Sequence, residues 1–294
     1  MKKRALVLGG GGPVGIAWEA GLLAGLAQDG VSLADADFIL GTSAGSFVGA
    51  QLAMGRKPQE LTAAILAEAD RPRPAQAGGG GAAPDLSPLM HMMWEARQGV
   101  REPADVRRDI GAFALAAKTM DEAAFIASFG RTFAALGDEV WPSPAFACTA
   151  VDALTGDFRL WDAASGAGLT RAVASSCSVP GIFPPITIKG RRYIDGGMRS
   201  GTNADLAKGH DLTVVIALSL GGETQMGRAT QAQLDDEVAM LRDAGGQVEV
   251  IAPDADSQSA FGPNLMDPAH RPAAARAGLA QGARIAAAIA AFWA

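Results

Sequence analysis

Cysteine is scarce in this chain, and so is histidine. Its 294 residues include two cysteines, Cys148 and Cys177, and three histidines. Two cysteines in a chain of this length do not make the disulfide framework that holds small secreted domains together. The sequence therefore predicts reduced, buried thiols and a cytoplasmic protein.

Charged residues are also few, and long apolar runs are absent. Asp, Glu, Lys and Arg make up 19% of the chain, the net charge is −6, and no basic block occurs. Nucleic acid is therefore not an expected partner. Strong electrostatic attraction to anionic lipid is not expected either. No apolar run approaches the 18 residues or so that a membrane-spanning helix needs. The apolar run at 5–8 is too short for a signal peptide.

The chain does contain alternating strand and helix patterns. Residues 4–8 have the pattern of a buried strand, and a glycine turn and apolar residues at helical spacing follow them. Residues 37–40 and 43–54 repeat this order of strand and helix. Such an opening predicts a parallel sheet that is covered by helices.

The rest of the chain shows no clear linker and no internal repeat, so we expect a single domain over 1–294. The stretch 71–84 is rich in Pro and Gly and predicts a flexible loop. Residues 85–136 have a helical pattern and could form a lid. Hairpin-like pieces centre on Thr155-Gly156 and Lys189-Gly190.

The glycine run Gly9 to Gly12, with Gly15 behind it, lies between the first strand and the first helix. Its backbone N–H groups could hold a phosphate or stabilise an oxyanion. The same run also matches the G-x-G-x-x-G fingerprint of dinucleotide-binding folds. Those folds need an acidic residue at the end of the second strand, and here that strand ends in Leu40-Gly41. The dinucleotide interpretation is therefore weak.

A second motif, Gly41-Thr42-Ser43-Ala44-Gly45, lies where the second strand turns into the second helix. A serine on such a turn is held out as a nucleophile, and the glycines make room for the strained backbone. Because the carboxyl ends of parallel strands meet at one edge of a sheet, Ser43 and the glycine run should lie together. Packing of small residues remains the alternative explanation for the motif.

A nucleophilic serine needs a base. His91, His210 and His270 occur in no context that suggests catalysis, although a histidine-dependent α/β-hydrolase would have to use His210 or His270. Asp195 ends a short strand and precedes two glycines, so substrate could approach it closely. Asp195 is therefore the preferred base, and a turn-forming Asp-Gly pair is its structural alternative.

Taken together, these pieces resemble the bacterial patatin-like phospholipase family. The matching stretches are "GGGGPVG", "GTSAG", "ASSCSVPGIFPP" at 174–185 and "YIDGG" at 193–197, in the order of that family and over roughly residues 5–200.

The resemblance implies a three-layer α/β/α sandwich with a mainly parallel central sheet. It implies a Ser43–Asp195 dyad without histidine and an oxyanion hole of Gly10, Gly11 and Gly12 amides. It further implies hydrolysis of lipid acyl esters through an acyl-enzyme, with no metal or cofactor. The partners expected are a lipid or ester substrate and, peripherally, a membrane.

One residue departs from the family pattern. Members often carry Arg or Lys two residues after the glycine triplet, where this chain has Val14. The loss of a cation there weakens the expectation of a strict phospholipid preference more than that of ester hydrolysis. A catalytically silent protein that holds an anionic lipid or phosphate on the same glycines is the main alternative function.

Overall fold

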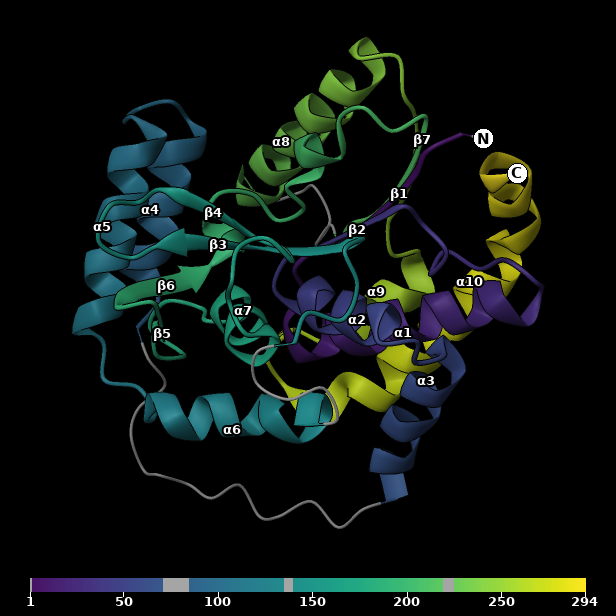
Figure 1. Ribbon diagram of the computed structural model, residues 1–294, viewed down its shortest axis with the longest axis horizontal. Helices are drawn as coiled ribbons and strands as arrows, with labels where there is room; N and C mark the ends of the chain where they lie inside the picture. Colours follow the sequence, from purple (N-terminus) through teal and green to yellow (C-terminus); the bar gives the residue numbers. More distant parts are fainter. Residues whose placement is uncertain (1, 71–84, 135–139, 219–224) are drawn as a thin grey trace.

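The computed structural model describes residues 2–70, 85–134, 140–218 and 225–294. In this part of the chain, an eight-stranded sheet lies between two layers of helices (Figure 1). The loop predicted at 71–84 falls outside the described residues. None of the described helices combines the length and the apolar character that a bilayer crossing requires.

The sheet is mainly parallel, as predicted. Its order is β5-β6-β3-β2-β1-β7-β8, and β4 pairs with β3. The strands are β1 (Arg4–Leu8), β2 (Phe38–Gly41), β3 (Phe146–Asp152), β4 (Phe158–Trp161), β5 (Ile186–Ile188), β6 (Arg191–Asp195), β7 (Leu212–Ile216) and β8 (Gln247–Ile251). The neighbours from β3 through β2, β1 and β7 to β8 are parallel. The pairs made by β4, β5 and β6 are antiparallel.

Two of the antiparallel pairs, β3–β4 and β5–β6, are the two predicted hairpins, and the third joins β3 to β6. Between β5 and β6, Lys189 and Gly190 both have positive φ, 50° and 75°. That conformation belongs to the two-residue turn whose twist matches the strands it joins. Both hairpins are therefore confirmed, and the second directs Asp195 back along β3.

Helices cover one face of the sheet in a thick layer, which buries most of the large apolar side chains. This layer contains α1 (Gly12–Gln28), α2 (Ala44–Ala53), α3 (Pro58–Leu66) with η1 (Ala67–Asp70), α6 (Glu122–Phe133), α7 (Leu169–Ser176), α9 (Ala255–Phe261) and α10 (Arg271–Trp293) with η5 (Pro268–His270). Four glycines let α1 and α10 pack closely, since a Cβ on Gly21, Gly25, Gly278 or Gly282 would overlap the backbone of the partner helix.

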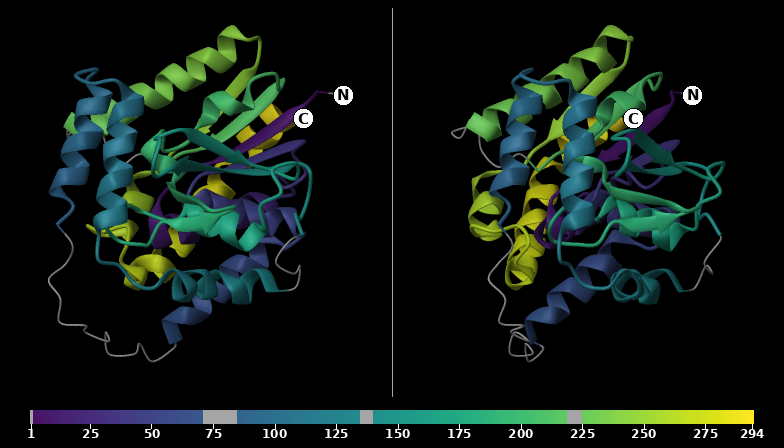
Figure 2. Two further views of the ribbon diagram at one scale, coloured as in Figure 1. Left: turned by 60° about the vertical axis from the view of Figure 1, so that its left-hand side comes forward. Right: turned by 90° about the vertical axis from the view of Figure 1, so that its left-hand side faces the viewer.

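The other face of the sheet carries a thinner layer (Figure 2). It contains α4 (Ser87–Arg97), α5 (Pro103–Ala116), η3 (Gly196–Met198), η4 (Ala204–Ala207) and α8 (Gln225–Asp243). α4 and α5 pack on β3 and β6, whereas α8 packs on β1, β7 and β8. Within the described residues 85–134, the predicted helical segment forms α4, α5 and α6, and these helices belong to different layers of the molecule.

Candidate active site

Ser43 lies on a sharp turn between β2 and α2, with φ 52° and ψ −116°. Positive φ is costly for a residue other than glycine and persists only where the surroundings impose it. The two flanking glycines are required here, because a Cβ on Gly41 would overlap Ser46 and a Cβ on Gly45 would overlap the carbonyl of Leu8. The sequence motif therefore has the backbone geometry of a nucleophile elbow.

Hydrogen bonds tie this turn to the glycine loop and to α7. Thr42 N–H donates to the carbonyl of Leu8 at 3.0 Å, and Gly45 N–H donates to that of Gly9 at 2.9 Å. The N–H of Ser43 itself donates to the Ser176 hydroxyl at 2.9 Å. The strained conformation of Ser43 is thus held from three directions.

Asp195 reaches Ser43 through the register of the sheet. Gly41 of β2 pairs with Cys148 of β3, and Ala150, two residues further along β3, pairs with Asp195 of β6. The turn that carries Ser43 therefore follows β2 on one side of β3, and Asp195 ends β6 on the other side, near the same end of β3. Asp195 N–H donates to the carbonyl of Ser178 at 3.0 Å, which fixes the end of β6.

Asp195 is buried, with 2% of the residue exposed. One oxygen, Oδ1, accepts a hydrogen bond from Gly197 N–H at 2.7 Å. The other, Oδ2, is buried and has no hydrogen-bond partner of ordinary length among the described residues. Burial raises the pKa of Asp195 to about 7, and the Gly197 N–H and the nearby Ser43 hydroxyl offset only part of this rise.

A buried polar network connects the loops that carry these two residues. The hydroxyl groups of Thr42 and Thr149 are 2.9 Å apart, and the Asn203 side-chain amide donates to Thr42 at 3.0 Å. The same amide donates to the carbonyls of Ser200 at 2.8 Å and Gly196 at 3.4 Å. Gly196 directly follows Asp195, so Asn203 spans from the nucleophile turn to the aspartate turn.

The glycine loop lies beside Ser43, since a Cβ on Gly10 would be 3.4 Å from that of Ser43. The oxyanion hole of Gly10, Gly11 and Gly12 amides stays a prediction, but the N–H of Gly10 already donates to the carbonyl of Gly201 at 2.8 Å. Gly11 and Gly12 differ from Gly10, because no described residue accepts a hydrogen bond from their backbone N–H groups. Gly12 has φ 59° and no room for a side chain against Leu265 and Met266. The candidates for an oxyanion hole therefore narrow to Gly11 and Gly12.

An apolar cavity of about 300 Å³ opens beside Ser43. Its walls come from the start of α1, from α6 and from the loop after α7, and they include Phe125, Phe129, Phe183 and Met120. The phenyl rings of Phe125 and Phe183 stack at 4.4 Å between centroids. The cavity can hold a hydrocarbon chain next to the serine.

Among the described residues, no hydrogen bond joins a histidine to Ser43 or Asp195. His210 stacks on Phe38 at the opposite end of β2 from Ser43, and its Nδ1 is 2.8 Å from the carbonyl of Ala207. His91 lies beside Glu95 within α4, and His270 beside Asp267. The geometry therefore gives no support to a histidine-dependent hydrolase.

Sequence patterns did not identify Ser176, Asn203 or the Leu265-Met266 pair as parts of this site. Ser176 fell within the matching stretch 174–185, so position alone could have drawn attention to it. Asn203 and Leu265 act through contacts with residues more than 100 positions away, and no local pattern signals such contacts.

A family model described as "Patatin-like phospholipase" matches residues 6–208. No curated protein matches the chain. Among solved structures, VipD from Legionella pneumophila is similar, with a TM-score of 0.47 and 14% identity over 98% of this chain and 67% of VipD. The type III effector ExoU gives a TM-score of 0.43 and 15% identity over 98% of this chain and 53% of ExoU. A complex of ExoU with SpcU from Pseudomonas aeruginosa gives a TM-score of 0.41 and 17% identity over 100% of this chain and 52% of the matched chain.

Proposed function

Because the chain belongs to the patatin-like phospholipase family, we propose that it is a serine hydrolase that cleaves acyl esters of lipids through a Ser43–Asp195 dyad. The observation that carries the proposal is the pairing of two unusual groups on either side of β3. One is a serine held at positive φ, and the other is a buried carboxyl whose pKa is raised to about 7 and whose Oδ2 has no partner of ordinary length among the described residues.

In the proposed reaction, Asp195 Oδ2 accepts the hydroxyl proton of Ser43 while Oγ attacks the ester carbonyl. The amides of Gly11 and Gly12 stabilise the oxyanion, and one such donor is typically worth about 10²–10³ in rate. The intermediate collapses, the alcohol leaves with the proton that Asp195 held, and an acyl-enzyme remains. Water, deprotonated by Asp195, then releases the fatty acid and regenerates Ser43.

The apolar cavity takes the acyl chain in this proposal. Met120 lines the cavity and is 46% exposed, so it extends the apolar wall to the surface. A methionine in that place could contact the edge of a micelle or bilayer. α6 comes from the segment 85–136, which could form a lid, and it supplies Phe125 and Phe129 to the cavity.

A fluorophosphonate probe with intact-mass spectrometry tests the dyad. We expect wild type and a control variant at an exposed aspartate, Asp29→Asn, to gain one adduct. Ser43→Ala should gain none, and Asp195→Asn should react far more slowly. Equal labelling of Asp195→Asn and wild type would contradict the dyad. A folded wild type that stays unlabelled with and without detergent micelles would support the silent lipid-binding function instead.

A further inference from the structure

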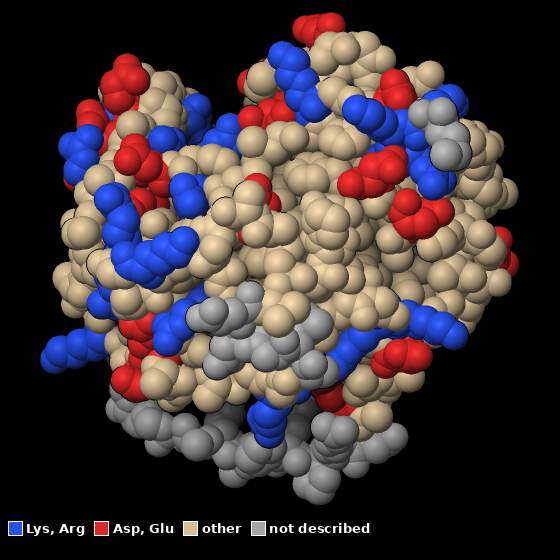
Figure 3. All heavy atoms as spheres, viewed as in Figure 1, with Lys and Arg blue, Asp and Glu red and all other residues tan. Residues whose placement is uncertain are grey.

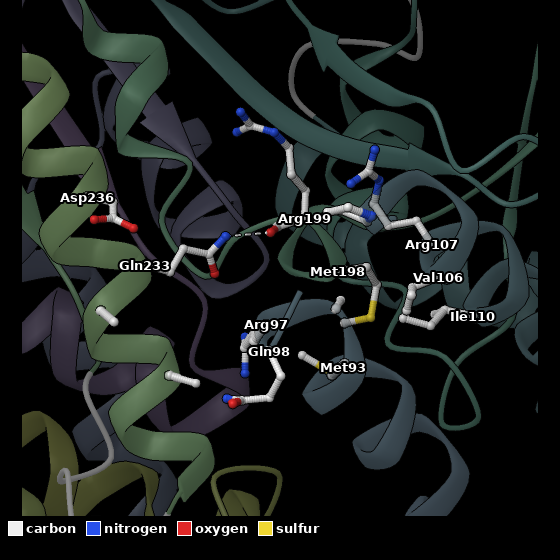
Figure 4. Close-up of a pocket in the computed structure, with 14 residues that line it drawn as sticks. Met93, Arg97, Gln98, Val106, Arg107, Ile110, Met198, Arg199, Gln233 and Asp236 are labelled. Atoms are coloured by element: carbon white, nitrogen blue, oxygen red, sulfur yellow. Dashed lines mark hydrogen bonds between the residues drawn. The ribbon is translucent and has the colours of Figure 1, made fainter. Parts of the chain in front are cut away.

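A second cavity, of about 350 Å³, lies in the thinner helical layer. α4 and α5 form one side of it, and α8 forms the other (Figure 4). In the space-filling view, a notch bordered by both basic and acidic side chains separates these two parts of the surface (Figure 3). This cavity is distinct from the apolar one, which lies on the other face of the sheet.

The lining of this cavity carries an excess of positive charge. Arg97, Arg107 and Arg199 face a single carboxylate, Asp236. The chain as a whole has the opposite sign, with a net charge of −6. Arg97 and Arg107 come from the consecutive helices α4 and α5, whereas Arg199 follows η3 much later in the chain, and the fold brings the three together. A concave surface with this balance favours an anion over a cation.

Arg107 and Arg199 differ in how far their charge is already neutralised. Arg199 makes a two-pronged ion pair with Asp205, at 2.9 and 2.7 Å. Among the described residues, no carboxylate lies within 4.0 Å of the Arg107 guanidinium. Burial and then the charge of Arg199 lower the pKa of Arg107. A bound anion would relieve the repulsion between the two guanidinium groups.

Arg107 also has a structural contact. Its Nε donates to the carbonyl of Gly156 at 2.7 Å, which joins α5 to the turn between β3 and β4. This bond uses one of the five N–H groups of the guanidinium. The others have no acceptor among the described residues, and a guanidinium fork matches a phosphate well. The contact therefore orients Arg107 without using up its capacity to bind an anion.

The cavity adjoins the loop of the proposed base. Asp195 leads through η3 to Met198 and Arg199, which both line the cavity. Gln233 of α8 donates to the Arg199 carbonyl at 2.9 Å, so the same loop is attached to the far wall (Figure 4). A ligand in the cavity would thus lie against the residues that position Asp195.

We propose that this cavity is a binding site for a phosphate group, either of a lipid headgroup or free in solution, with Arg107 as its main ligand. The headgroup form rests on the proposed lipid hydrolysis.

Kinetics on two lipids in one neutral detergent test the headgroup form. Hydrolysis of phosphatidylglycerol is compared with that of diacylglycerol, which lacks the phosphate, in Triton X-100 mixed micelles. We expect Arg107→Gln to lower kcat/KM about tenfold for phosphatidylglycerol only, since a hydrogen bond to a charged group is worth roughly that factor. Arg107→Lys should retain most of the preference because it keeps the charge. Arg108→Gln is the control, since Arg108 is its exposed neighbour and pairs with Asp105 at 2.6 Å.

Binding of inorganic phosphate is measured separately, as a rise in the thermal midpoint of the protein. We expect this rise in wild type and Arg108→Gln, and its loss in Arg107→Gln. Arg97→Gln should also reduce the rise in the thermal midpoint, although it leaves the hydrogen bond between Arg107 and Gly156 intact. A phosphate shift without lipid discrimination would support the site with free phosphate as its ligand. If wild type hydrolyses neither lipid yet retains the shift, the proposed function fails and the site stands. If phosphate has no effect and Arg107→Gln matches Arg108→Gln on both lipids, the proposal is overturned.

Discussion

The hydroxyl groups of Thr42 and Thr149 lie 2.9 Å apart, between the ends of β2 and β3, and the side-chain amide of Asn203 donates to the Thr42 hydroxyl. Thr42 precedes Ser43, and the Asn203 amide also reaches Gly196, which follows Asp195. We do not propose that Thr42, Thr149 or Asn203 touches the substrate. Their hydrogen bonds hold the turn of Ser43 and the turn of Asp195 at a fixed separation.

Asn203 should therefore be a positioning residue. It has φ 52°, so Asn203→Gly keeps the backbone accessible while it removes the amide. We expect kcat to fall about tenfold with little change in KM, since loss of a buried donor costs about 1–3 kcal/mol. Steady-state kinetics alongside thermal unfolding check this. A folded variant with unchanged kcat would mean that the network only stabilises the protein.

Ester hydrolysis should follow the ionisation of Asp195. The group acts as a base only when it is deprotonated, and its pKa is raised to about 7 by burial. We expect kcat/KM to fall about tenfold for each pH unit below about 7 and to level off above it. The residual activity of Asp195→Asn should not show this fall of kcat/KM below about pH 7. A wild-type profile that is flat from pH 4 to 9 would argue against Asp195 as the base.

Gly45→Ala should prevent the elbow from forming, because the added Cβ would overlap the carbonyl of Leu8 in the sheet. We expect a loss of more than about 4 kcal/mol in the free energy of unfolding, or no folded protein. Gly130→Ala in α6 is the matched control, since a Cβ there meets nothing within 4 Å. That variant should gain up to about 1 kcal/mol. Denaturant unfolding compares the two, and equal stabilities would refute the steric explanation.

Glu19 lies in α1, wholly buried, and both of its carboxyl oxygens lack a hydrogen-bond partner among the described residues. Burial raises its pKa well above the ordinary value. Burial thus favours the protonated form of Glu19 in the folded state, whereas in the unfolded state the group ionises above about pH 4.3. The folded state binds more protons, so stability falls as the pH rises through this range.

The neutral variant Glu19→Gln should remove this dependence on pH. We expect it to be more stable than wild type at pH 8, with the difference shrinking towards pH 4. Each unit of pKa shift contributes about 1.4 kcal/mol to that difference. Unfolding curves at several pH values measure it, and a difference that stays constant from pH 4 to 8 would show that Glu19 does not titrate on unfolding.

Much of this arrangement could be predicted from local patterns. The apolar run at 4–8, the glycine run behind it and the Gly41 to Gly45 motif each carry their own signal, because strand, turn and helix preferences act over a few residues. The common edge of β1 and β2 follows from parallel pairing. The hairpin turn at Lys189-Gly190 is equally local.

What could not be predicted depends on contacts between distant segments. No pattern near Gly10 indicates that Gly201 takes its amide, since the two meet only after β1 and β6 join the sheet. The arginine cavity is similarly hidden, because the sequence has no basic block and three separate elements supply its charges. The helical pattern at 85–136 also says nothing of the face on which each helix packs.

The glycine loop contacts Leu265 and Met266, so its folded conformation depends on a segment that is synthesised about 250 residues later. Val14 N–H donates to Leu265, and the four glycines between α1 and α10 fit together only when both helices are present. Ser43 emerges from the ribosome before Leu265, Met266 and α10, so the loop beside it stays unsupported until these segments have been synthesised. We expect Ser43 to lack its folded conformation on the nascent chain until then, which would delay the proposed ester cleavage.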